Sequence, residues 1–520
     1  MLMRALICFS LLRVHDATAT TSFFSFDMGA SSLIPTTNGF TITGNAASDQ
    51  LGRSVSTAGD IDNDGYDDII VGAPYHNTNQ GVAYVIYGRA TSSLLDIDLS
   101  IALDAHTTGF TITGQALDHL GFSVSTAGDV NKDGYDDIIV SAWGQNSNRG
   151  AVYVIYGGPK SSMQNIDFSA GATLNPSTTG FRVGGNTASD QFGWSVGTAG
   201  DVNGDGYSDI IVGALKASRG AASPGAAYVI YGGPTMSNLD LTTALTPLTN
   251  GFTITGANDG DQLGWSVSTA GDINKDGFDD IIIGANGMYV GGLAGAGGAY
   301  VIYGASSMSN FDFYSGTTLN YLTTGFLCTG NVYNYQLGIS VSTAGDINND
   351  GYDDIMVGVK TTSVVGAVFV IYGGQKSSLP NRVLGTSSNP LSPSTTGFLI
   401  VGSAAGDLLG WPVGAAGDLN KHGYNDILIG AYGKSSAKGA AYVIYGGPKS
   451  SMSDLVLSTA LNPLTNGFMI TGSASNDQLG VSVNIAGDIN GDGYVDIIIG
   501  ANGKSSSKGA AYVIHTGISI

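Results

Sequence analysis

The chain has 520 residues, of which 20 are Lys or Arg and 41 are Asp or Glu, giving a formal net charge of −21 at pH 7. This acidic balance excludes the basic footprint of a nucleic-acid-binding protein, and 79 Gly without a period of three exclude collagen. Every acidic residue is Asp, so the strong polar helix formers are scarce while Gly, Asp, Asn, Ser and Thr abound. The composition predicts an all-β protein with many turns.

The N-terminus resembles a secretory leader. Arg4 precedes the apolar run Ala5–Leu12, and the small residues Ala17–Ala19 follow as a cleavage candidate. Charged residues lie between the apolar run and the cleavage candidate and interrupt the pattern of a leader. The alternative is that the start of the chain is truncated or misassigned. We predict a signal peptide over residues 1–20 and one domain over residues 21–520, secreted or at the cell surface.

The two cysteines do not indicate a disulfide framework. Cys8 lies in the predicted leader, and Cys328 lies in an apolar strand pattern, where we expect a buried thiol. No stretch of 18 uninterrupted apolar residues occurs, so we predict no transmembrane segment.

Seven internal repeats dominate the rest of the chain. Each contains four short apolar segments, which in the second repeat are Gly109–Gly114, Leu120–Gly128, Ile138–Val140 and Ala151–Gly157. These segments are rich in β-branched and aromatic residues and are bounded by Gly, Asn or Asp, which is typical of strands. We predict a seven-bladed β-propeller of four-stranded blades, with an open-ended solenoid as the alternative.

The order of the segments also predicts how the ring closes. A spare strand, Gly39–Gly44, precedes the first repeat, whereas the last repeat ends at Ala511–Ile514 without a fourth strand. We therefore expect the N-terminal strand to complete the C-terminal blade.

Each repeat carries the pattern D-x-[DN]-x-[DNH]-G-x-x-D between its second and third segments. Oxygen ligands at positions 1, 3, 5 and 9, a backbone carbonyl at position 7 and a turn-permitting Gly at position 6 suit Ca²⁺. The pattern resembles an EF-hand loop, but no Glu occurs at position 12 and the flanking segments are predicted strands. The predicted ligands are Asp60, Asp62, Asp64, Tyr66 and Asp68; Asp129, Asn131, Asp133, Tyr135 and Asp137; Asp201, Asn203, Asp205, Tyr207 and Asp209; Asp272, Asn274, Asp276, Phe278 and Asp280; Asp346, Asn348, Asp350, Tyr352 and Asp354; Asp418, Asn420, Tyr424 and Asp426; and Asp488, Asn490, Asp492, Tyr494 and Asp496.

We predict about six or seven structural Ca²⁺ sites. The sixth loop has His422 at position 5, and imidazole is a poor ligand for a hard cation, so this site is expected to be weak or empty. The competing interpretation is that Asp and Asn only make turns. Seven loops in register, each with Gly at position 6, favour the metal.

These motifs resemble the FG-GAP repeats of the integrin α-subunit N-terminal propeller. The "FG" pairs are Leu51-Gly52, Leu120-Gly121, Phe192-Gly193, Leu263-Gly264, Leu337-Gly338, Leu409-Gly410 and Leu479-Gly480. The "GAP" triplets are Gly72-Ala73-Pro74, Gly213-Ala214-Leu215, Gly284-Ala285-Asn286, Gly430-Ala431-Tyr432 and Gly500-Ala501-Asn502. The resemblance implies a calcium-bearing propeller used in adhesion and ligand binding. Integrin α subunits have such loops in only some blades, and whether this chain has a β-subunit-like partner stays open.

Two surfaces are candidates for a partner. The residues after the "FG" pairs are expected around the upper end of the axis, where ordinary packing is the favoured interpretation and a partial aromatic cup that could hold a cation is the alternative; they are Arg53, Phe122, Trp194, Trp265, Ile339, Trp411 and Val481. The variable loops after the third segment of each repeat could bind a protein or glycan, or could be plain solvated turns.

No catalytic motif is evident. The six His residues share no metal spacing and are expected at the surface or in loops, and the Asp residues that precede the "FG" pairs are expected to make turns. We favour a non-catalytic adhesion or ligand-binding module. The alternative is a Ca²⁺-dependent polysaccharide-active enzyme, either a lyase or a glycosidase.

Overall fold

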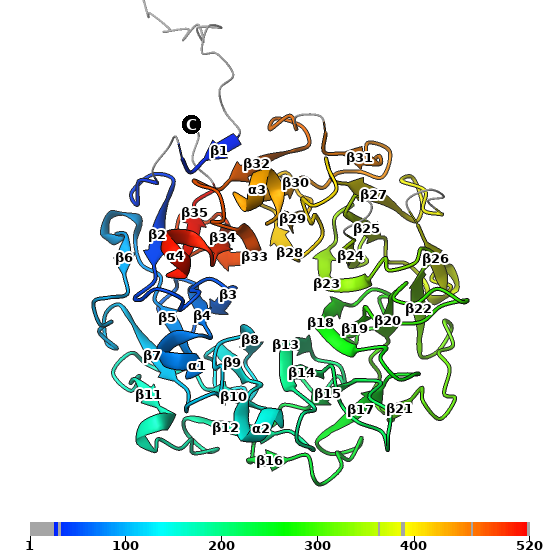
Figure 1. Cartoon of the computed structure of the whole chain (residues 1–520), viewed down its shortest axis with the longest axis horizontal. Coiled ribbons are helices and arrows are strands. Elements are labelled where there is room, and N and C mark those ends of the chain that lie inside the picture. Colours follow the sequence, from blue (N-terminus) through cyan, green and yellow to red (C-terminus); the bar gives the residue numbers. More distant parts are fainter. Residues whose placement is uncertain (1–24, 30–32, 362–364, 386–389, 459–460, 517–520) are drawn as a thin grey trace, which may run out of the picture.

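The computed structural model describes residues 25–29, 33–361, 365–385, 390–458 and 461–516, so the predicted signal peptide lies outside the described residues. The described chain forms seven sheets that surround a central axis like blades (Figure 1). The predicted all-β, seven-bladed propeller is confirmed, and the closed ring excludes the solenoid. No helix in this part of the chain is long and apolar enough to cross a membrane.

Blades are numbered here by repeat, and their strands are given from the axis outward. Blade 1 contains β3 (Ser54–Gly59), β4 (Asp68–Ala73), β5 (Val82–Ile86), β7 (Gly109–Thr113) and β11 (Ile166–Asp167). Blade 2 contains β8 (Val124–Gly128), β9 (Asp137–Ala142), β10 (Ala151–Ile155), β12 (Gly180–Gly184) and β16 (Leu239–Asp240). Blade 3 contains β13 (Phe192–Gly200), β14 (Asp209–Ala214), β15 (Ala226–Ile230), β17 (Gly251–Thr255) and β21 (Phe311–Asp312).

The remaining blades repeat this order. Blade 4 contains β18 (Leu263–Gly271), β19 (Asp280–Ala285), β20 (Gly298–Ile302), β22 (Gly325–Gly330) and β26 (Arg382–Leu384). Blade 5 contains β23 (Leu337–Gly345), β24 (Asp354–Val359), β25 (Ala367–Ile371), β27 (Gly397–Val401) and β31 (Leu455–Val456). Blade 6 contains β28 (Val413–Gly417), β29 (Asp426–Gly430), β30 (Ala440–Ile444), β32 (Gly467–Thr471) and β1 (Ser25–Asp27). Blade 7 contains β33 (Leu479–Gly487), β34 (Asp496–Ala501), β35 (Ala510–Ile514), β2 (Gly39–Thr43) and β6 (Ile97–Asp98).

The prediction of four-stranded blades is wrong by one strand, because every blade has a short fifth strand at its outer edge. This strand runs parallel to the fourth, as β11 does to β7. In the blades other than blade 6, an Asn or Asp before this strand anchors it; for example, Asn165 Oδ1 accepts a hydrogen bond from the Thr111 N–H at 2.9 Å. A strand of two or three residues has no readable periodicity, so the sequence pattern did not reveal it.

The N-terminal segment joins two blades of the ring. Strand β2 pairs antiparallel with β35, from Gly39 opposite Ile514 to Thr43 opposite Ala510, and so completes blade 7. Strand β1 pairs parallel with β32 in blade 6. The ring is therefore closed by hydrogen bonds between segments that are more than 400 residues apart in the chain.

The core lies between adjacent blades. Second strands such as β4 and β9 are buried along their whole length, so their side chains pack against both neighbouring blades. Ile70 of blade 1, for example, lies in one apolar cluster with Val124 and Ile138 of blade 2. Cys328 is fully buried in blade 4, as predicted.

The two ends of the propeller differ in their loops. The Asp-rich loops join the first and second strands at one end, here called the lower face. The opposite, upper face carries the variable loops, which include α1 (His76–Asn79), α2 (Gln145–Asn148), α3 (Lys434–Ala437) and α4 (Lys504–Ser507). Each of these short helices contains consecutive residues with positive φ, such as Asn146 and Ser147, and is therefore a left-handed turn. The 3₁₀ turns are η1 (Thr91–Ser93), η2 (Phe168–Ala170) and η3 (Lys376–Ser378).

Candidate metal centre

Seven nine-residue loops on the lower face share one backbone conformation. They are numbered as the blades are, and positions 1 to 9 of loop 1 are Asp60 to Asp68. The position-1 carboxylate closes the loop: Asp60 accepts hydrogen bonds from the N–H groups of Asp64 at 3.0 Å and Gly65 at 2.9 Å. The equivalent pair of bonds occurs in all seven loops. Gly65 has a φ of 89°, which explains why Gly is required at position 6.

The position-9 carboxylate begins the second strand and is fully buried. In loop 1, Asp68 accepts hydrogen bonds from the Ile61 N–H at 3.0 Å and the Gly88 N–H at 2.8 Å, so it ties the loop to the third strand. Burial raises the pKa of Asp137 and of Asp209 to about 8, outweighing the backbone hydrogen bonds that lower it. Ionising this buried carboxyl group at neutral pH is therefore costly, and a nearby cation would lower that cost.

The predicted ligands of loop 1 converge. Ligand oxygens of Asp60, Asp62 and Asp68 lie within 4.8 Å of one another. Asp62 Oδ1 is buried without a hydrogen-bond partner among the described residues, as are the amide oxygens of Asn274 in loop 4 and Asn348 in loop 5. Buried oxygens without donors are costly unless a cation or water satisfies them. This donor set, made only of oxygens, fits a hard divalent cation.

Three lysines that the sequence reasoning missed reach these loops from the connection after a third strand. Lys160 Nζ lies 3.1 Å from Asp62 and also contacts Asp64, Lys376 Nζ lies 2.7 Å from Asp276, and Lys449 pairs with Asp350. Each ammonium also lies about 5 Å from a Tyr ring at the end of the strand. The recurring Gly-Gly-x-Lys sequence was the available signal. It was not informative by itself, because each Lys contacts the Asp loop of a neighbouring blade.

Loop 6 departs from the others because His422 stands at position 5. Its Nδ1 lies 3.0 Å from Asp418 and its Nε2 lies 3.7 Å from Asp426. The imidazole thus bridges positions 1 and 9, where a cation would make its contacts in the other loops. Burial raises the pKa of Asp426 to about 7, and His422 opposes this rise.

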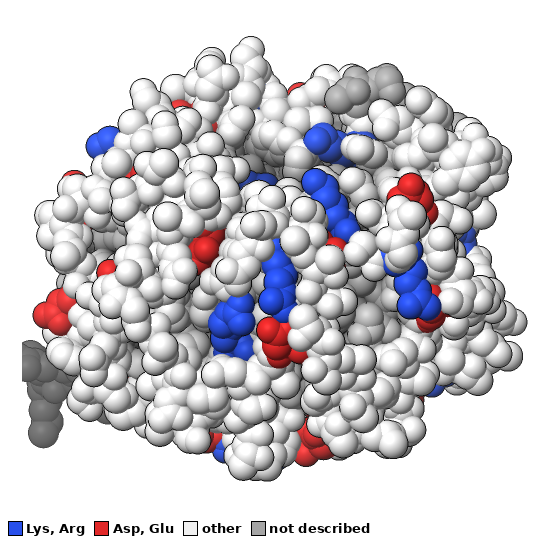
Figure 2. Space-filling model, turned by 60° about the horizontal axis from the view of Figure 1, so that its bottom comes forward, with Lys and Arg blue, Asp and Glu red and all other residues white. Residues whose placement is uncertain are grey.

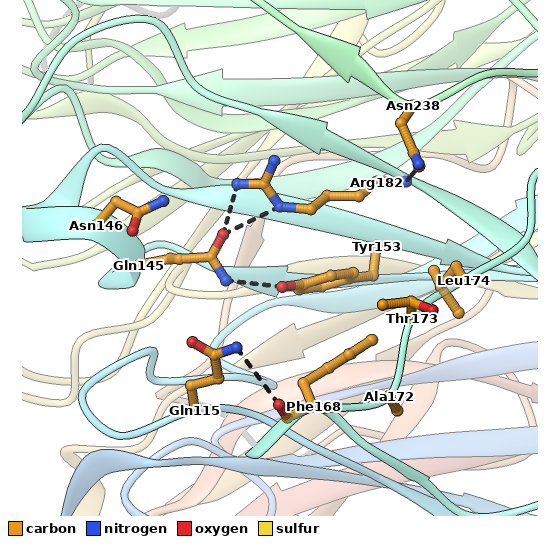
Figure 3. A pocket seen from close by; sticks show the side chains of 10 residues that line it. All are labelled: Gln115, Gln145, Asn146, Tyr153, Phe168, Ala172, Thr173, Leu174, Arg182 and Asn238. Carbon is orange, nitrogen blue, oxygen red and sulfur yellow. Dashed lines mark hydrogen bonds between the residues drawn. The ribbon is translucent and has the colours of Figure 1, made fainter. Parts of the chain in front are cut away.

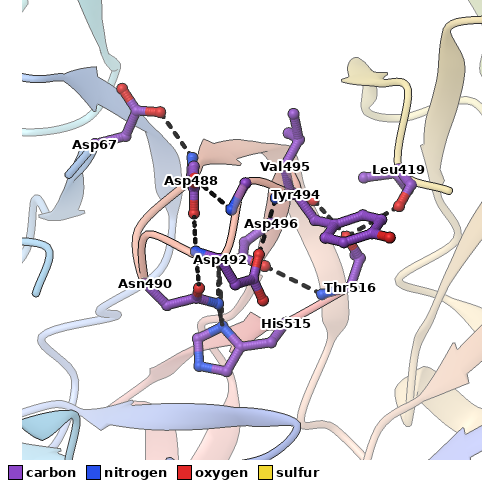
Figure 4. Close-up of polar contacts among 11 residues, drawn as sticks. Asp67, Leu419, Asp488, Asn490, Asp492, Tyr494, Val495, Asp496, His515 and Thr516 are labelled. Atoms are coloured by element: carbon purple, nitrogen blue, oxygen red, sulfur yellow. Dashed lines mark hydrogen bonds and ion pairs between the residues drawn. The ribbon is translucent and has the colours of Figure 1, made fainter. Parts of the chain in front are cut away.

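Beside loop 7 lies His515, which was expected at the surface or in a loop; it follows the end of β35 but is buried, so the expectation of an exposed position is wrong (Figure 4). His515 replaces the Tyr that ends the third segment of the other repeats. Its Nδ1 lies 3.1 Å from Asp496 and 3.1 Å from the Asn490 amide nitrogen (Figure 4). Burial raises the pKa of Asp496 to about 6, and His515 limits this rise.

Neighbouring loops are linked in several blades by the residue at position 8. Asp136 of loop 2 accepts a hydrogen bond from the Asp60 N–H of loop 1 at 3.0 Å. The same contact joins Asp279 to Asp201, Asp353 to Asp272 and, across the ring closure, Asp67 to Asp488. Hydrogen bonds therefore connect neighbouring loops of the lower face. A change in the conformation of one loop is expected to alter the conformation of its neighbour.

The upper mouth of the central channel is lined by the residues predicted to form the aromatic cup. A cavity of about 220 Å³ opens there, with Arg53, Phe122, Trp194, Trp265 and Trp411 among its lining residues. Neighbouring rings touch, with centroids 4.7 Å apart for Phe122 and Trp194 and 5.4 Å apart for Trp194 and Trp265. The aromatic side chains therefore form a partial ring around the mouth, which Ile339 and Val481 interrupt.

A larger cavity of about 440 Å³ lies on the outer part of blade 2 and is lined by Gln, Asn and Arg side chains (Figure 3). Its polar groups largely satisfy one another. Gln145 donates to the Tyr153 hydroxyl at 2.7 Å and accepts from Arg182 at 3.1 and 2.5 Å (Figure 3). The site consequently has little unmet hydrogen-bonding capacity.

Charged side chains are sparse on the face shown in Figure 2, where Lys and Arg side chains lie beside a hollow in the surface. Acidic residues concentrate instead in the loops of the lower face. The net charge of −21 is therefore unevenly distributed over the propeller.

Comparison with known proteins agrees with the fold and the loops. Six segments match the FG-GAP repeat, at residues 51–86, 120–155, 192–230, 263–302, 337–371 and 480–514. The fold is that of a β-propeller, and six of its seven blades contain a segment that matches the FG-GAP repeat. The corresponding segment of blade 6, which holds His422, is not among the matches. The chain resembles the N-terminal propeller of integrin α subunits.

Curated relatives include integrins and an enzyme. The chain is 32% identical to integrin alpha pat-2 of Caenorhabditis elegans over 247 residues, covering 46% of this chain and 18% of the relative. It is 29% identical to integrin alpha-8 of Mus musculus over 251 residues, covering 46% and 20%. It is 29% identical to phosphatidylinositol-glycan-specific phospholipase D of Homo sapiens over 231 residues, covering 42% and 24%. These alignments span about a quarter or less of each relative's length.

Proposed function

We propose that this chain is an extracellular calcium-binding propeller that acts as an adhesion or ligand-binding module. The observation that carries the proposal is the set of seven loops closed by the same hydrogen bonds, each with a carboxylate at position 1, an Asp or Asn at position 3 and a buried Asp at position 9; in loop 1 the ligand oxygens of Asp60, Asp62 and Asp68 lie within 4.8 Å of one another. Ca²⁺ would be held by the side chains at positions 1, 3, 5 and 9 and the carbonyl at position 7, and would supply charge neutralisation and cross-linking. The integrin relatives support the adhesive role.

Titration of the chelated full-length chain with Ca²⁺ by calorimetry tests the metal sites. We expect about six equivalents to bind, because loop 6 is filled by His422. Each site adds about 2.7 kcal/mol of stability at 100 times its Kd. Since the unfolding entropy of a chain of about 500 residues makes 1 kcal/mol worth about 1 °C, the melting temperature should rise by roughly 15 °C.

A pair of variants sharpens this titration. Asp205→Ala removes a predicted ligand oxygen of loop 3 and should lower the stoichiometry by one equivalent. Asp98→Ala, in the exposed outer strand β6, should leave it unchanged. Equal stoichiometry in both variants, or no calcium binding at all, would support the competing interpretation, in which the Asp loops are turns that bind no metal.

Loop 6 offers a gain-of-binding prediction. His422→Asp restores the carboxylate found at this position in the other loops and removes the imidazole that contacts Asp418 and Asp426. We expect one additional equivalent of Ca²⁺ in the calorimetric titration. Asn77→Asp, which adds a carboxylate at an exposed position of an upper-face loop, serves as the control. An unchanged stoichiometry in the His422→Asp variant would show that His422 is not what weakens this site.

A non-catalytic role is favoured by the Asp residues near the upper face. Asp118 and Asp261 each accept a hydrogen bond from the N–H three residues earlier, at 3.0 and 2.8 Å, as turn residues do. The phospholipase relative keeps an enzymatic role as the second candidate. Turnover of a phosphatidylinositol-glycan or a polysaccharide by the purified chain in millimolar Ca²⁺ would favour that candidate.

A further inference from the structure

Two cations at the mouth of the central channel lack an acidic partner. Arg53 lines the cavity and lies 4.6 Å from the Phe122 ring centroid, and Lys360 Nζ lies 3.7 Å from the centroid of Trp411, whose ring lines the same cavity. Within the described residues, neither side chain makes a hydrogen bond or ion pair. In a chain of net charge −21, two such cations at one opening are unusual.

Their surroundings strengthen the attraction for an anion. Arg53 is close enough to Tyr75 and Tyr432 to interact with them electrostatically, and Tyr432 packs edge-on against Trp411 at 5.4 Å. Arg53 and Lys360 are both only partly exposed to solvent, and this burial lowers the pKa of each side chain. An anion that replaces the lost hydration would therefore be bound more strongly here than at an exposed lysine.

The aromatic rings define the rest of the ligand. All four Trp residues of the chain belong to this region, because Trp143 contacts Trp194 at 5.7 Å and Trp194, Trp265 and Trp411 line the cavity. Broad aromatic surfaces favour a compact ligand with an apolar face. The cavity of about 220 Å³ is large enough for a group the size of one sugar ring.

Serine hydroxyls beside the rings provide both kinds of hydrogen bond. The oxygens of Ser54, Ser123 and Ser340 accept backbone N–H groups at 2.9 to 3.1 Å, which leaves their O–H groups as donors. The hydroxyls of Ser195, Ser266 and Ser482 donate to carbonyl oxygens at 2.8 to 2.9 Å, which leaves their lone pairs as acceptors. Sugar hydroxyl groups, which both donate and accept, match such a mixed ring.

We propose that the upper mouth of the channel binds one carboxylated sugar residue, with its carboxylate beside Arg53 and its apolar face on the Trp rings. Lys360 contributes a second, more distant positive charge. The proposal rests on the ligand-binding role proposed above and names its ligand class. An acidic side chain of a protein partner would satisfy the cations but would leave the Trp surfaces and most of the hydroxyl ring unused.

The test is titration of the calcium-saturated full-length chain with D-glucuronate, followed by tryptophan fluorescence and calorimetry. D-Glucose is the neutral control, and N-acetyl-glutamate amide is the acidic control without a sugar ring. We expect saturable binding of glucuronate with a fluorescence change, and binding of glucose at least tenfold weaker, since a charge-assisted hydrogen bond is lost.

Variants assign the site. Arg53→Gln should weaken glucuronate binding roughly tenfold to a hundredfold, and Lys360→Gln less, because Lys360 does not line the cavity. Lys421→Gln, which removes a similar cation–π contact with Tyr494 at 3.9 Å on the lower face, should not change it. Absence of saturable binding, equal binding of glucose, or equal binding of the glutamate derivative would each overturn the proposal. Since calcium binding is measured separately, such a failure is distinct from a failure of the metal sites.

Discussion

Without calcium, the melting temperature of the protein should fall as the pH is raised from 5 to 8. The cause lies in the position-9 carboxylates, whose folded-state pKa values lie above the ordinary value of 3.8. Burial raises the pKa of Asp137 and Asp209 to about 8, and that of Asp68, Asp280 and Asp354 well above the ordinary range. The folded state therefore binds more protons than the unfolded state between about pH 4 and pH 8.

The sign of the effect follows from this difference. A group whose pKa is higher in the folded state stabilises the fold below its unfolded pKa, and this stability is lost as the pH rises through the folded value. One pKa unit corresponds to about 1.4 kcal/mol. With about 1 °C per kcal/mol for a chain of this length, we expect a decrease on the order of 10 °C in a chelator.

Saturating Ca²⁺ should reverse this trend. A bound cation keeps the carboxylates ionised in the folded state, so protons compete with calcium at pH 5 and the melting temperature should rise toward pH 8. Scanning calorimetry at several pH values, with chelator and with millimolar Ca²⁺, measures both slopes.

A double variant isolates the responsible groups. Asp137→Asn with Asp209→Asn replaces two titrating carboxyls by amides of the same shape, so the slope in chelator should become shallower. Asp98→Asn and Asp312→Asn, at outer strands, should leave the slope unchanged. Parallel slopes with and without calcium in the unmodified chain would contradict the assignment of position 9 as a metal ligand.

The propeller could be predicted from the sequence because the sequence pattern of its strands and loops recurs in seven repeats. The second strands, such as Asp68–Ala73, read as short continuous apolar runs because both of their faces are buried between blades. The Asp loops were recognisable because the hydrogen bonds that the position-1 carboxylate accepts, such as those from the N–H groups of Asp64 and Gly65 to Asp60, lie within a single loop.

Contacts between distant parts of the chain were not predictable from the sequence. Lys160 lies 96 residues from Asp64 in the sequence, and only the arrangement of neighbouring blades brings the two side chains together. The same holds for Asp67, which reaches the Asp488 N–H across the ring closure. His515 contacts Asp496, and no sequence pattern near His515 indicates this buried contact.

Removal of residues 1–44 should open the ring. This deletion eliminates β2, whose Phe40 and Ile42 are fully buried in blade 7, and leaves β35 as an unpaired edge. Loss of a buried Phe or Ile side chain costs roughly 2–5 kcal/mol each, and an exposed edge strand invites pairing with another molecule. We expect the truncated chain to melt several degrees lower and to elute as dimers or larger assemblies in size-exclusion chromatography with light scattering.

Two further molecules make this result specific to closure. A chain lacking only residues 1–24 keeps β1 and β2 and should behave as the full-length chain does. A synthetic peptide of residues 33–44 added to the open ring should restore the monomer, because it can pair with β35 and return Phe40 to its cluster. The same peptide with Phe40→Ala should fail to do so. A truncated chain that stays monomeric with an unchanged melting temperature would show that contacts between the other blades hold the ring closed without this strand.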